Sequence, residues 1–539
     1  MTSWQTAVQT ASSKYPKGET ALKFGTAGFR CHASLLVSPS FRVGLLAAVR
    51  SRSVGGQVIG VMITASHNPV QDNGVKLVDP MGEMFPGRWE QFATDLVNAD
   101  DVVGALEAII AAEGVDMSTP AAVTFAVDTR PSGAELSAAL MAGLAAVGAT
   151  PFDYGQLTTP QLHYMVRCKN TQLRFGADNE GGYFNKLADA YYRFVGGAKG
   201  APSTVVVDAA NGVGAAKARQ LALALEDVLT IKVVNDGTGG GVLNLDCGAD
   251  HVKTGQKQPA NVTLGGSGEF CSLDGDADRI VYYFADAAGT FRLLDGDRIA
   301  ALAARFIQTA LRTVGLDLAL GVVQTAYANG NSTRFMREEL GAEVVFACTG
   351  VKHLHHKAEA FDIGVYFEAN GHGTVVFSQK AIDALHTLDS SAFSAEQLTA
   401  LRRLRALPDL INQTVGDALS DMLLVQGILA VTGWTCADWL AMYSDLANRL
   451  LKVTVADRGV FETADADTRL VQPAGLQEQV QALVAPVASG RSFVRPSGTE
   501  DVVRVYAEAD TQEATDALGI AVAKLVHAKA GGVGPEPSL

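Results

Sequence analysis

Three aspartates at alternate positions form the pattern with the clearest chemistry. Asp274, Asp276 and Asp278 lie in the segment CSLDGDADRIVYYF (271–284). An extended segment would place all three carboxylates on one side, where they would repel one another strongly without a cation. Carboxylate oxygens suit a hard divalent ion, and an EF-hand loop is excluded because Arg279 stands where that loop needs glycine. The spacing predicts a metal site, with the Arg279 guanidinium suited to an anion that bridges metal and protein.

A serine that follows an apolar strand is the candidate nucleophile. Ser66 comes after the run VIGVMIT (58–64), and His67 follows it directly. A hydroxyl presented on an exposed loop at a strand end is well placed for nucleophilic catalysis. Lys76, further along the same segment, could shuttle a proton or bind a phosphate. On local chemistry alone, an ordinary turn and a solvated lysine are the alternatives.

Two further segments carry groups that bind sugars and phosphates. In YFEANGHGTVVF (366–377), Glu368, Asn370 and His372 alternate on an open, glycine-rich loop, which suits sugar hydroxyls; a polar hairpin turn is the alternative. In SFVRPSGTEDVVRVYAEA (492–509), two guanidinium groups, two hydroxyls and a glycine turn predict an anion cradle, with a solvent-facing turn as the alternative. The residues of this cradle are Arg495, Ser497, Gly498, Thr499 and Arg504.

The elements that position these groups have an α/β pattern. Short β-branched runs occur at 58–64, 121–128, 203–210, 230–235, 318–325 and 342–347. Between them lie segments with apolar residues at helical spacing, such as 135–148 and 298–315. This alternation predicts α/β layers. A strand, a small-residue turn and a helix recur near 121–145, 203–225 and 321–340, which predicts three related α/β units.

Composition excludes several classes of protein. The 539 residues are enough for several domains, and 48% hydrophobic with 19% charged residues excludes a disordered chain. A net charge of −14 without any basic run argues against a nucleic-acid partner. The most apolar stretch, 423–431, is too short to span a bilayer. Six cysteines without a CxxC pair, and an N-terminal stretch without a secretory apolar region, predict a cytoplasmic location.

Seven motifs, in the order given below, resemble those of the α-D-phosphohexomutases. Their residues are similar to the motifs of the phosphoacetylglucosamine mutase branch. They are FGTAGFR (24–30), ITASHNPVQDNGVKLVDPMGEM (63–84), SLDGDADR (272–279), TGVKHLHHKA (349–358), FEANGHG (367–373), LINQTVGDALSDMLL (410–424) and FVRPSGTEDVVRVYAEA (493–509). The resemblance covers about residues 20 to 510 and implies three related α/β domains plus a smaller C-terminal α+β domain. We expect a phosphoserine-loop domain, a metal-binding domain, a sugar-binding domain with a helical insertion and a phosphate-binding domain, at 1–198, 199–297, 298–440 and 441–539.

The resemblance also implies a role for each motif residue. Ser66 would carry a phosphoryl group and would hold Mg²⁺ together with Asp274, Asp276 and Asp278. The other implied catalytic residues are Arg30, His67, Lys76 and Arg279. The implied substrate-binding residues are Glu368, Asn370, Gly371 and His372 of the sugar loop, Lys352 and His353 of a basic rim, and Arg495, Ser497, Gly498, Thr499 and Arg504 of the phosphate loop.

The reaction implied by the resemblance is the interconversion of N-acetyl-glucosamine 6-phosphate and N-acetyl-glucosamine 1-phosphate, through a phosphoserine and a bisphosphate, in UDP-N-acetylglucosamine biosynthesis. The activator would be N-acetyl-glucosamine 1,6-bisphosphate or glucose 1,6-bisphosphate. Asn370 favours this branch, because many mutases of glucose or mannose phosphates have serine there. The alternatives are a phosphoglucomutase or phosphomannomutase, a phosphatase with a serine intermediate, and an inactive paralogue that binds other molecules. We expect a monomer whose partner is a small sugar phosphate, neither nucleic acid nor membrane.

Overall fold

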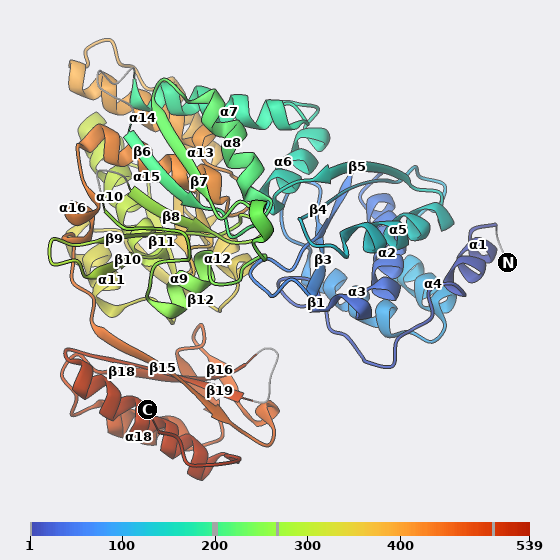
Figure 1. Ribbon diagram of the computed structural model, residues 1–539. Coiled ribbons are helices and arrows are strands. Elements are labelled where there is room, and N and C mark those ends of the chain that lie inside the picture. Colours follow the sequence, from blue (N-terminus) through green and yellow to red (C-terminus); the bar gives the residue numbers. More distant parts are fainter. Residues whose placement is uncertain (1–2, 197–202, 266–268, 498–501, 539) are drawn as a thin grey trace. The chain divides into compact units, whose positions relative to one another are not determined.

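The computed structural model describes residues 3–196, 203–265, 269–497 and 502–538 (Figure 1). The chain divides into two compact units. The first unit comprises Met1–Asp295 and Arg405–Gly433, and the second comprises Gly296–Leu404 and Trp434–Leu539. The predicted α/β layers are confirmed, because helices pack against sheets in both units. Among the described residues, no helix combines the length and the apolar character needed to cross a membrane.

The first sheet of the first unit carries the candidate serine. Its order is β1-β3-β2-β4-β5, built from β1 (Phe29–His32), β2 (Ile59–Ile63), β3 (Asp72–Val78), β4 (Ala122–Val127) and β5 (Thr150–Gln156). β4 is parallel to β2 and to β5, whereas β3 is antiparallel to β2 and to β1. All five residues of β2 are buried, which explains its unbroken apolar run. The loop between β2 and β3 contains Ser66.

The second sheet of the first unit repeats these strand directions, although the chain passes through the strands in a different order. Its order is β10-β9-β8-β6-β7, built from β6 (Ser203–Asp208), β7 (Leu229–Val234), β8 (Glu269–Leu273), β9 (Ile280–Ala285) and β10 (Phe291–Leu294). β6 is parallel to β7 and to β8, and β9 is antiparallel to β8 and to β10. The turn between β8 and β9 contains the three aspartates, in the place that the Ser66 loop occupies in the first sheet.

The large sheet of the second unit has the topology of the four strands β7-β6-β8-β9. Its order is β12-β11-β13-β14, built from β11 (Leu320–Thr325), β12 (Glu343–Ala347), β13 (Ile363–Phe367) and β14 (Gly373–Phe377). β11 is parallel to both β12 and β13, and β14 is antiparallel to β13. The turn between β13 and β14 contains Glu368 and His372. The three predicted related α/β units are therefore confirmed, and each presents its polar loop after the same central strand.

A smaller α+β layer ends the chain. Strands β15 (Ala447–Thr454), β19 (Val502–Ala509) and β18 (Arg491–Pro496) form an antiparallel sheet in that order, and β16 (Glu462–Ala464) pairs with β17 (Arg469–Gln472). Helices α17 (Leu476–Val484) and α18 (Gln512–Lys529) accompany this sheet. Buried Val453, Val503 and Val522 belong to its core. The predicted C-terminal α+β domain is confirmed.

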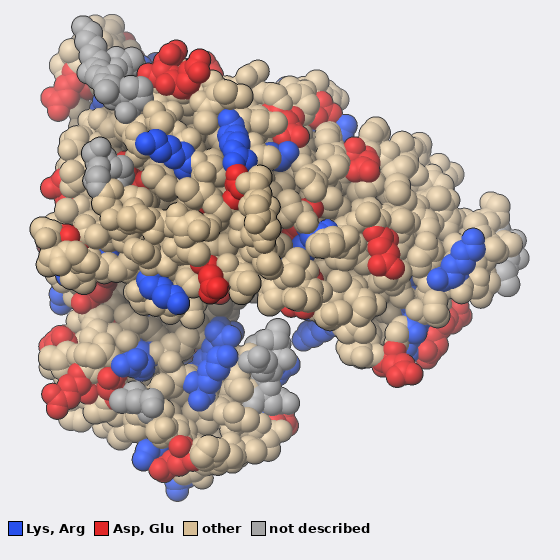
Figure 2. All heavy atoms as spheres, viewed as in Figure 1, with Lys and Arg blue, Asp and Glu red and all other residues tan. Residues whose placement is uncertain are grey.

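Helices complete both units. Those of the first unit are α1 (Ser3–Ser12), α2 (Val37–Ser53), α3 (Gly87–Asn98), α4 (Val102–Glu113), α5 (Gly133–Ala146), α6 (Thr159–Asn170), α7 (Glu180–Val195), α8 (Gly214–Ala224), α9 (Ala249–Gly255) and α15 (Ala418–Thr432). Those of the second unit are α10 (Gly296–Val314), α11 (Gly330–Arg334), α12 (Val351–Ala358), α13 (Gln379–Thr387) and α16 (Cys436–Leu440), besides α17 and α18. The boundary between the units falls within α14 (Ala395–Leu410). Acidic and basic side chains are interspersed over the face in Figure 2.

Candidate functional site

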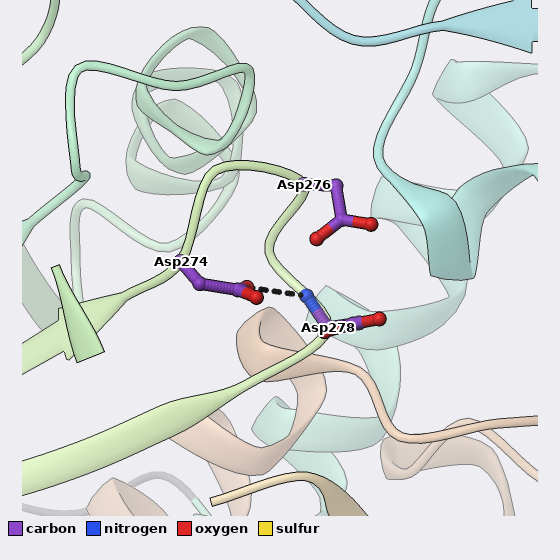
Figure 3. Close-up of side chains that lie close together, drawn as sticks. All are labelled: Asp274, Asp276 and Asp278. Atoms are coloured by element: carbon purple, nitrogen blue, oxygen red, sulfur yellow. Dashed lines mark hydrogen bonds between the residues drawn. The ribbon is translucent and has the colours of Figure 1, made fainter. Parts of the chain in front are cut away.

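The three predicted metal ligands converge at the turn between β8 and β9, here called the metal turn (residues 274–278). Each offers a carboxylate oxygen, these oxygens lie within 4.8 Å of one another, and all three residues are buried (Figure 3). The expectation of an extended segment is wrong, because the chain bends here and Ala277 has a φ of +56°. The backbone N–H groups of Asp278 and Arg279 donate to Asp274 Oδ1 at 3.1 and 3.2 Å. The bend thus brings the carboxylates together.

The carboxylates of the metal turn fit a divalent cation. Burial raises the pKa of Asp274 well above its ordinary value, and the charges of Asp278 and Asp276 raise it further. In the described part of the chain, the buried Oδ1 of Asp276 has no hydrogen-bond partner. A hard cation would satisfy this oxygen and would offset the repulsion among the carboxylates. The residues therefore suit Mg²⁺, as the sequence predicted.

The Ser66 hydroxyl lies against the metal turn. Its Oγ donates to Asp274 Oδ2 at 2.5 Å and lies 3.5 Å from Asp278 Oδ1. The expectation of an exposed serine is wrong, because Ser66 is fully buried. The metal turn packs directly on its backbone: a Cβ atom added at Gly275 would lie only 2.6 Å from the Ser66 carbonyl oxygen. Glycine is required there, and the two loops form one cluster.

Two of the predicted cations pair with these carboxylates. Lys76 on β3 has its Nζ 3.2 Å from Asp276 Oδ2 and 3.4 Å from Asp278 Oδ2. Arg279 has its Nε 3.8 Å from Asp274 Oδ2 and 3.7 Å from Asp278 Oδ1. Positive charge therefore surrounds the serine and its carboxylates. A phosphoryl group on Ser66 would meet these cations.

Arg30 and His67 lie at the same cluster. Arg30 on β1 donates through Nη1 to Asn68 Oδ1 at 3.4 Å, and burial lowers its pKa. Burial lowers the pKa of His67 to about 2, and the nearby guanidinium groups of Arg279 and Arg30 add to this effect. The His67 imidazole is therefore neutral at pH 7. It can form a hydrogen bond with a phosphate but not an ion pair.

The sugar loop is a tight turn in the second unit. The Glu368 N–H donates to the His372 carbonyl and the Gly371 N–H to the Glu368 carbonyl, both at 2.9 Å. The prediction of an open loop is therefore wrong. The sugar loop has the geometry of the alternative, a polar hairpin turn. Glu368 and His372 are buried, whereas Asn370 is partly exposed. Gly371 has a φ of +88°, which glycine adopts without strain.

Helix α12 adjoins the sugar loop. The Gly350 N–H, directly before this helix, donates to Glu368 Oε1 at 3.0 Å, while Glu368 Oε2 accepts from Asn370 Nδ2 at 3.3 Å. Lys352 and His353 follow in the first turn of α12, with His353 exposed and Lys352 partly exposed. The predicted basic rim is therefore joined to the sugar loop through the backbone at Gly350.

Three cations stand in a row on the C-terminal sheet. Arg495 on β18 is directly opposite Arg504 on β19, which is directly opposite Lys452 on β15. Directly opposed residues on neighbouring antiparallel strands share a face, and like charges there destabilise a sheet. The Asp467 carboxylate, 3.9 Å from Arg495 Nε, offsets part of this repulsion, and an anion bound by the three side chains would relieve the rest. Ser497 is buried and its N–H bonds to the Val502 carbonyl; Gly498 and Thr499 lie outside the described residues.

Sequence reasoning missed three contributors to these sites. Lys452 stands in no motif, and only strand register reveals it. Thr159 donates through Oγ1 to Asp276 Oδ2 at 2.6 Å. The capping box formed by Thr158 and Gln161, a signal readable from the sequence, marks the start of its helix α6. The Ala418 N–H, at the start of α15, bonds to the Ala277 carbonyl and so supports the metal turn.

Four family-domain models match this chain. Phosphoacetylglucosamine mutase AMG1, domain III, matches residues 295–434, and domain II of the same family matches residues 181–281. Phosphoglucomutase/phosphomannomutase, alpha/beta/alpha domain I, matches residues 45–104 and 90–175, and the C-terminal domain of that family matches residues 450–525. Together these models cover more than half of the chain.

Whole-chain relatives agree with these matches. The phosphoacetylglucosamine mutase of Sus scrofa is 49% identical over 532 residues, which are 98% of this chain and 97% of the relative. Aspergillus fumigatus N-acetylphosphoglucosamine mutase, in complex with GlcNAc-6P and magnesium, is 50% identical with a TM-score of 0.94, covering 98% of this chain and 99% of that one. A variant of the Aspergillus protein, in complex with glucose 1,6-bisphosphate, is 49% identical with a TM-score of 0.93 over 99% and 100% of the two chains. The chain belongs to the phosphoacetylglucosamine mutase family, as its motifs predicted.

Proposed function

We propose that this chain is a phosphoacetylglucosamine mutase that interconverts N-acetyl-glucosamine 6-phosphate and N-acetyl-glucosamine 1-phosphate. The observation that carries the proposal is the Ser66 hydroxyl, 2.5 Å from a carboxylate of the metal turn. A serine beside three converging carboxylates and two paired cations suits a phosphoserine enzyme. The Aspergillus relative binds GlcNAc-6P and magnesium, which are the substrate and the metal proposed here.

Ser66 carries the phosphoryl group that is exchanged. The free sugar hydroxyl attacks the phosphorus, the bond between phosphorus and Ser66 Oγ breaks, and the hydroxyl proton ends on Oγ. The resulting 1,6-bisphosphate turns over and returns its other phosphate to Ser66, which releases the isomer. Bound by Asp274, Asp276, Asp278 and a phosphoserine oxygen, Mg²⁺ supplies positive charge to the transferring group.

The cations around the metal turn stabilise the transfer. Lys76 and Arg279 lie within 3.2–3.8 Å of the carboxylates. From there they stabilise the negative charge of the phosphoryl group while it leaves Ser66 and when it returns. Arg30 supports them from β1, and His67 acts as a neutral hydrogen-bonding group. Phosphoryl transfer depends mainly on such positioning and charge stabilisation.

The loops of the second unit select and hold the substrate. Glu368, Asn370, Gly371 and His372 bind the sugar, with Lys352 and His353 beside them. Support comes from the hydrogen bonds that order Glu368 and Asn370. Arg495, Ser497, Gly498, Thr499 and Arg504 hold the phosphate that is not reacting, and the register of the sheet adds Lys452 to this group. Glucose 1,6-bisphosphate or N-acetyl-glucosamine 1,6-bisphosphate acts as the activator, which the Aspergillus complex with the former supports.

The proposal includes the domain bounds, the location and the oligomeric state of the enzyme. The domains are 1–198, 199–297, 298–440 and 441–539, and support comes from the family-model matches at 45–175, 295–434 and 450–525, which lie close to three of these ranges. The enzyme works as a cytoplasmic monomer in UDP-N-acetylglucosamine biosynthesis. All six cysteines are free thiols, as is usual for a protein of a reducing compartment.

Phosphorus NMR tests the proposal. Purified protein, Mg²⁺ and a catalytic amount of glucose 1,6-bisphosphate are incubated with each sugar phosphate in turn. We expect the signals of N-acetyl-glucosamine 6-phosphate and 1-phosphate to interconvert. A higher kcat/KM for glucose or mannose phosphates would assign the chain to the other mutases. Steady release of inorganic phosphate without isomer would indicate a phosphatase, and no reaction at all would indicate an inactive paralogue.

A further inference from the structure

A buried arginine holds the loop that carries Ser66, here called the serine loop (residues 64–72). The Arg130 side chain is fully buried. Its Nη2 donates to the carbonyls of Ser66 and Asn68 at 3.0 and 2.9 Å. Its Nη1 donates to the carbonyls of Pro69 and Asp72 at 2.5 and 2.9 Å. One guanidinium therefore binds four backbone carbonyls of a single loop.

Asp128 fixes the direction of this guanidinium. Arg130 Nε donates to Asp128 Oδ2 at 3.0 Å, and the Arg130 N–H donates to Asp128 Oδ1 at 2.8 Å. The same carboxylate accepts the Thr64 hydroxyl at 2.7 Å, and Thr64 Oγ1 in turn accepts the Ser66 N–H at 3.0 Å. The buried charge is thus paired, and both the N–H and the carbonyl of Ser66 belong to one hydrogen-bond network.

Asn244, in a loop between two strands of the second sheet, also holds the serine loop. It lies between β7 and β8, and its own N–H bonds to the Ala210 carbonyl at 2.9 Å. Its side-chain Nδ2 donates to the carbonyls of Ser66 and Asn68 at 2.9 and 3.0 Å. These are two of the carbonyls that Arg130 also binds. The Ser66 carbonyl therefore has donors from two loops, one after β4 of the first sheet and one between β7 and β8 of the second.

Ser66 needs this support because of its backbone conformation. Its φ is +54°, a left-handed value that costs free energy for a residue with a side chain. The backbone conformation sets the direction of the Cα–Cβ bond, from which the side-chain torsion brings Oγ to the metal turn. Without the donors, the serine would relax and the hydroxyl would turn away from its carboxylate neighbours.

We infer that Arg130 and Asn244 are positioning residues, which clamp the serine loop so that Ser66 Oγ stays aimed for both phosphoryl transfers. The inference rests on the proposed function. Ser66 must act first as donor and then as acceptor, and its hydroxyl must hold one direction while the intermediate turns over. Small errors in the position of a reacting atom cost much of the rate, so a rigid loop serves both steps.

Asn244→Ala is the decisive variant, because it removes two donors without leaving a buried charge unpaired. Asn170→Ala is its matched control. Asn170 is also partly exposed, and its Nδ2 also bridges two carbonyls, those of Val58 and Pro80, but near the opposite end of β2; its Oδ1 in addition accepts the Val58 N–H at 2.8 Å. Asn244→Gln keeps the amide donor and should retain more activity than Asn244→Ala.

The readouts are steady-state kinetics, the melting temperature, and the rate at which glucose 1,6-bisphosphate phosphorylates Ser66, followed by intact mass. For Asn244→Ala we expect kcat and the phosphorylation rate to fall by about ten- to a hundredfold. KM should stay unchanged. Asn244 has a φ of +59°, which alanine adopts with more strain than asparagine, so both alanine variants should lower the melting temperature, whereas the kcat of Asn170→Ala stays at the wild-type value. Wild-type kcat in Asn244→Ala, or an equal loss in both alanine variants, would overturn the clamp. If Asn244→Ala does not fold, Asn244→Asp, which keeps the size of the side chain but removes the donor, decides by the same rates. A wild-type protein that neither isomerises the substrate nor takes up phosphate would instead refute the proposed function.

Discussion

Replacing Arg504 by alanine tests the row of cations on the C-terminal sheet. Arg504 is partly exposed and stands between Arg495 and Lys452 on neighbouring strands. Two effects of opposite sign follow from this position. The variant loses a contact to the phosphate that is not reacting, and it loses two unfavourable neighbours in the free enzyme. Affinity and stability should therefore move in different directions.

The magnitudes follow from the two kinds of contact. A charge-assisted hydrogen bond contributes about 1.5–3 kcal/mol, which corresponds to a rise in KM of about 10- to 150-fold. The phosphate keeps its charge throughout the reaction, so the contact is mostly uniform binding and KM should change more than kcat. Relief of cross-strand repulsion is worth about 0.2–1 kcal/mol per pair, so the free energy of unfolding should stay equal or rise.

Steady-state kinetics at saturating bisphosphate and a urea melt measure both quantities. Arg449→Ala is the matched control: Arg449 lies on β15 of the same sheet, an odd number of residues from Lys452 and so on the other face, where it pairs with Asp516 at 2.7 Å. The control should leave KM unchanged and lower stability slightly. An unchanged KM in Arg504→Ala would remove this residue from the phosphate site. A clear loss of stability would show that the cation row is not repulsive.

Three further variants test the remaining groups. Ser66→Ala should abolish turnover and the phosphoryl adduct seen by intact mass, while the lost buried bond to Asp274 costs about 1–3 kcal/mol of stability; retained turnover would refute the phosphoserine. Asp276→Asn should weaken Mg²⁺ binding and lower kcat. A chelator should abolish the activity of the wild-type enzyme, and added Mg²⁺ should restore it. Wild-type activity in excess chelator would contradict the metal site. Lys452→Ala should raise KM by about tenfold, and wild-type kinetics would exclude Lys452 from the phosphate contacts.

The sequence by itself was enough for the class of fold and for most of the chemical groups. The buried strands β2 and β11 appear as short, mostly apolar runs, because burial on both faces disfavours polar side chains; the two polar residues of β11, Gln324 and Thr325, stand at its end. The three aspartates and Ser66 stand in short motifs whose chemistry depends on residue type and spacing. Such motifs are short stretches of sequence, so they can be recognised without the three-dimensional structure.

The tertiary structure alone decided how these groups meet. Asp274 is 208 residues from Ser66, and Asn244 is 178 residues from it, yet both bond to it. The exposed serine and the extended aspartates were wrong expectations, because packing buries the first and a left-handed Ala277 bends the second. Arg130 and Lys452 carry no motif, since their roles depend on which carbonyls and which strands lie beside them. Contacts between distant segments depend on the three-dimensional fold, and local residue patterns do not encode them.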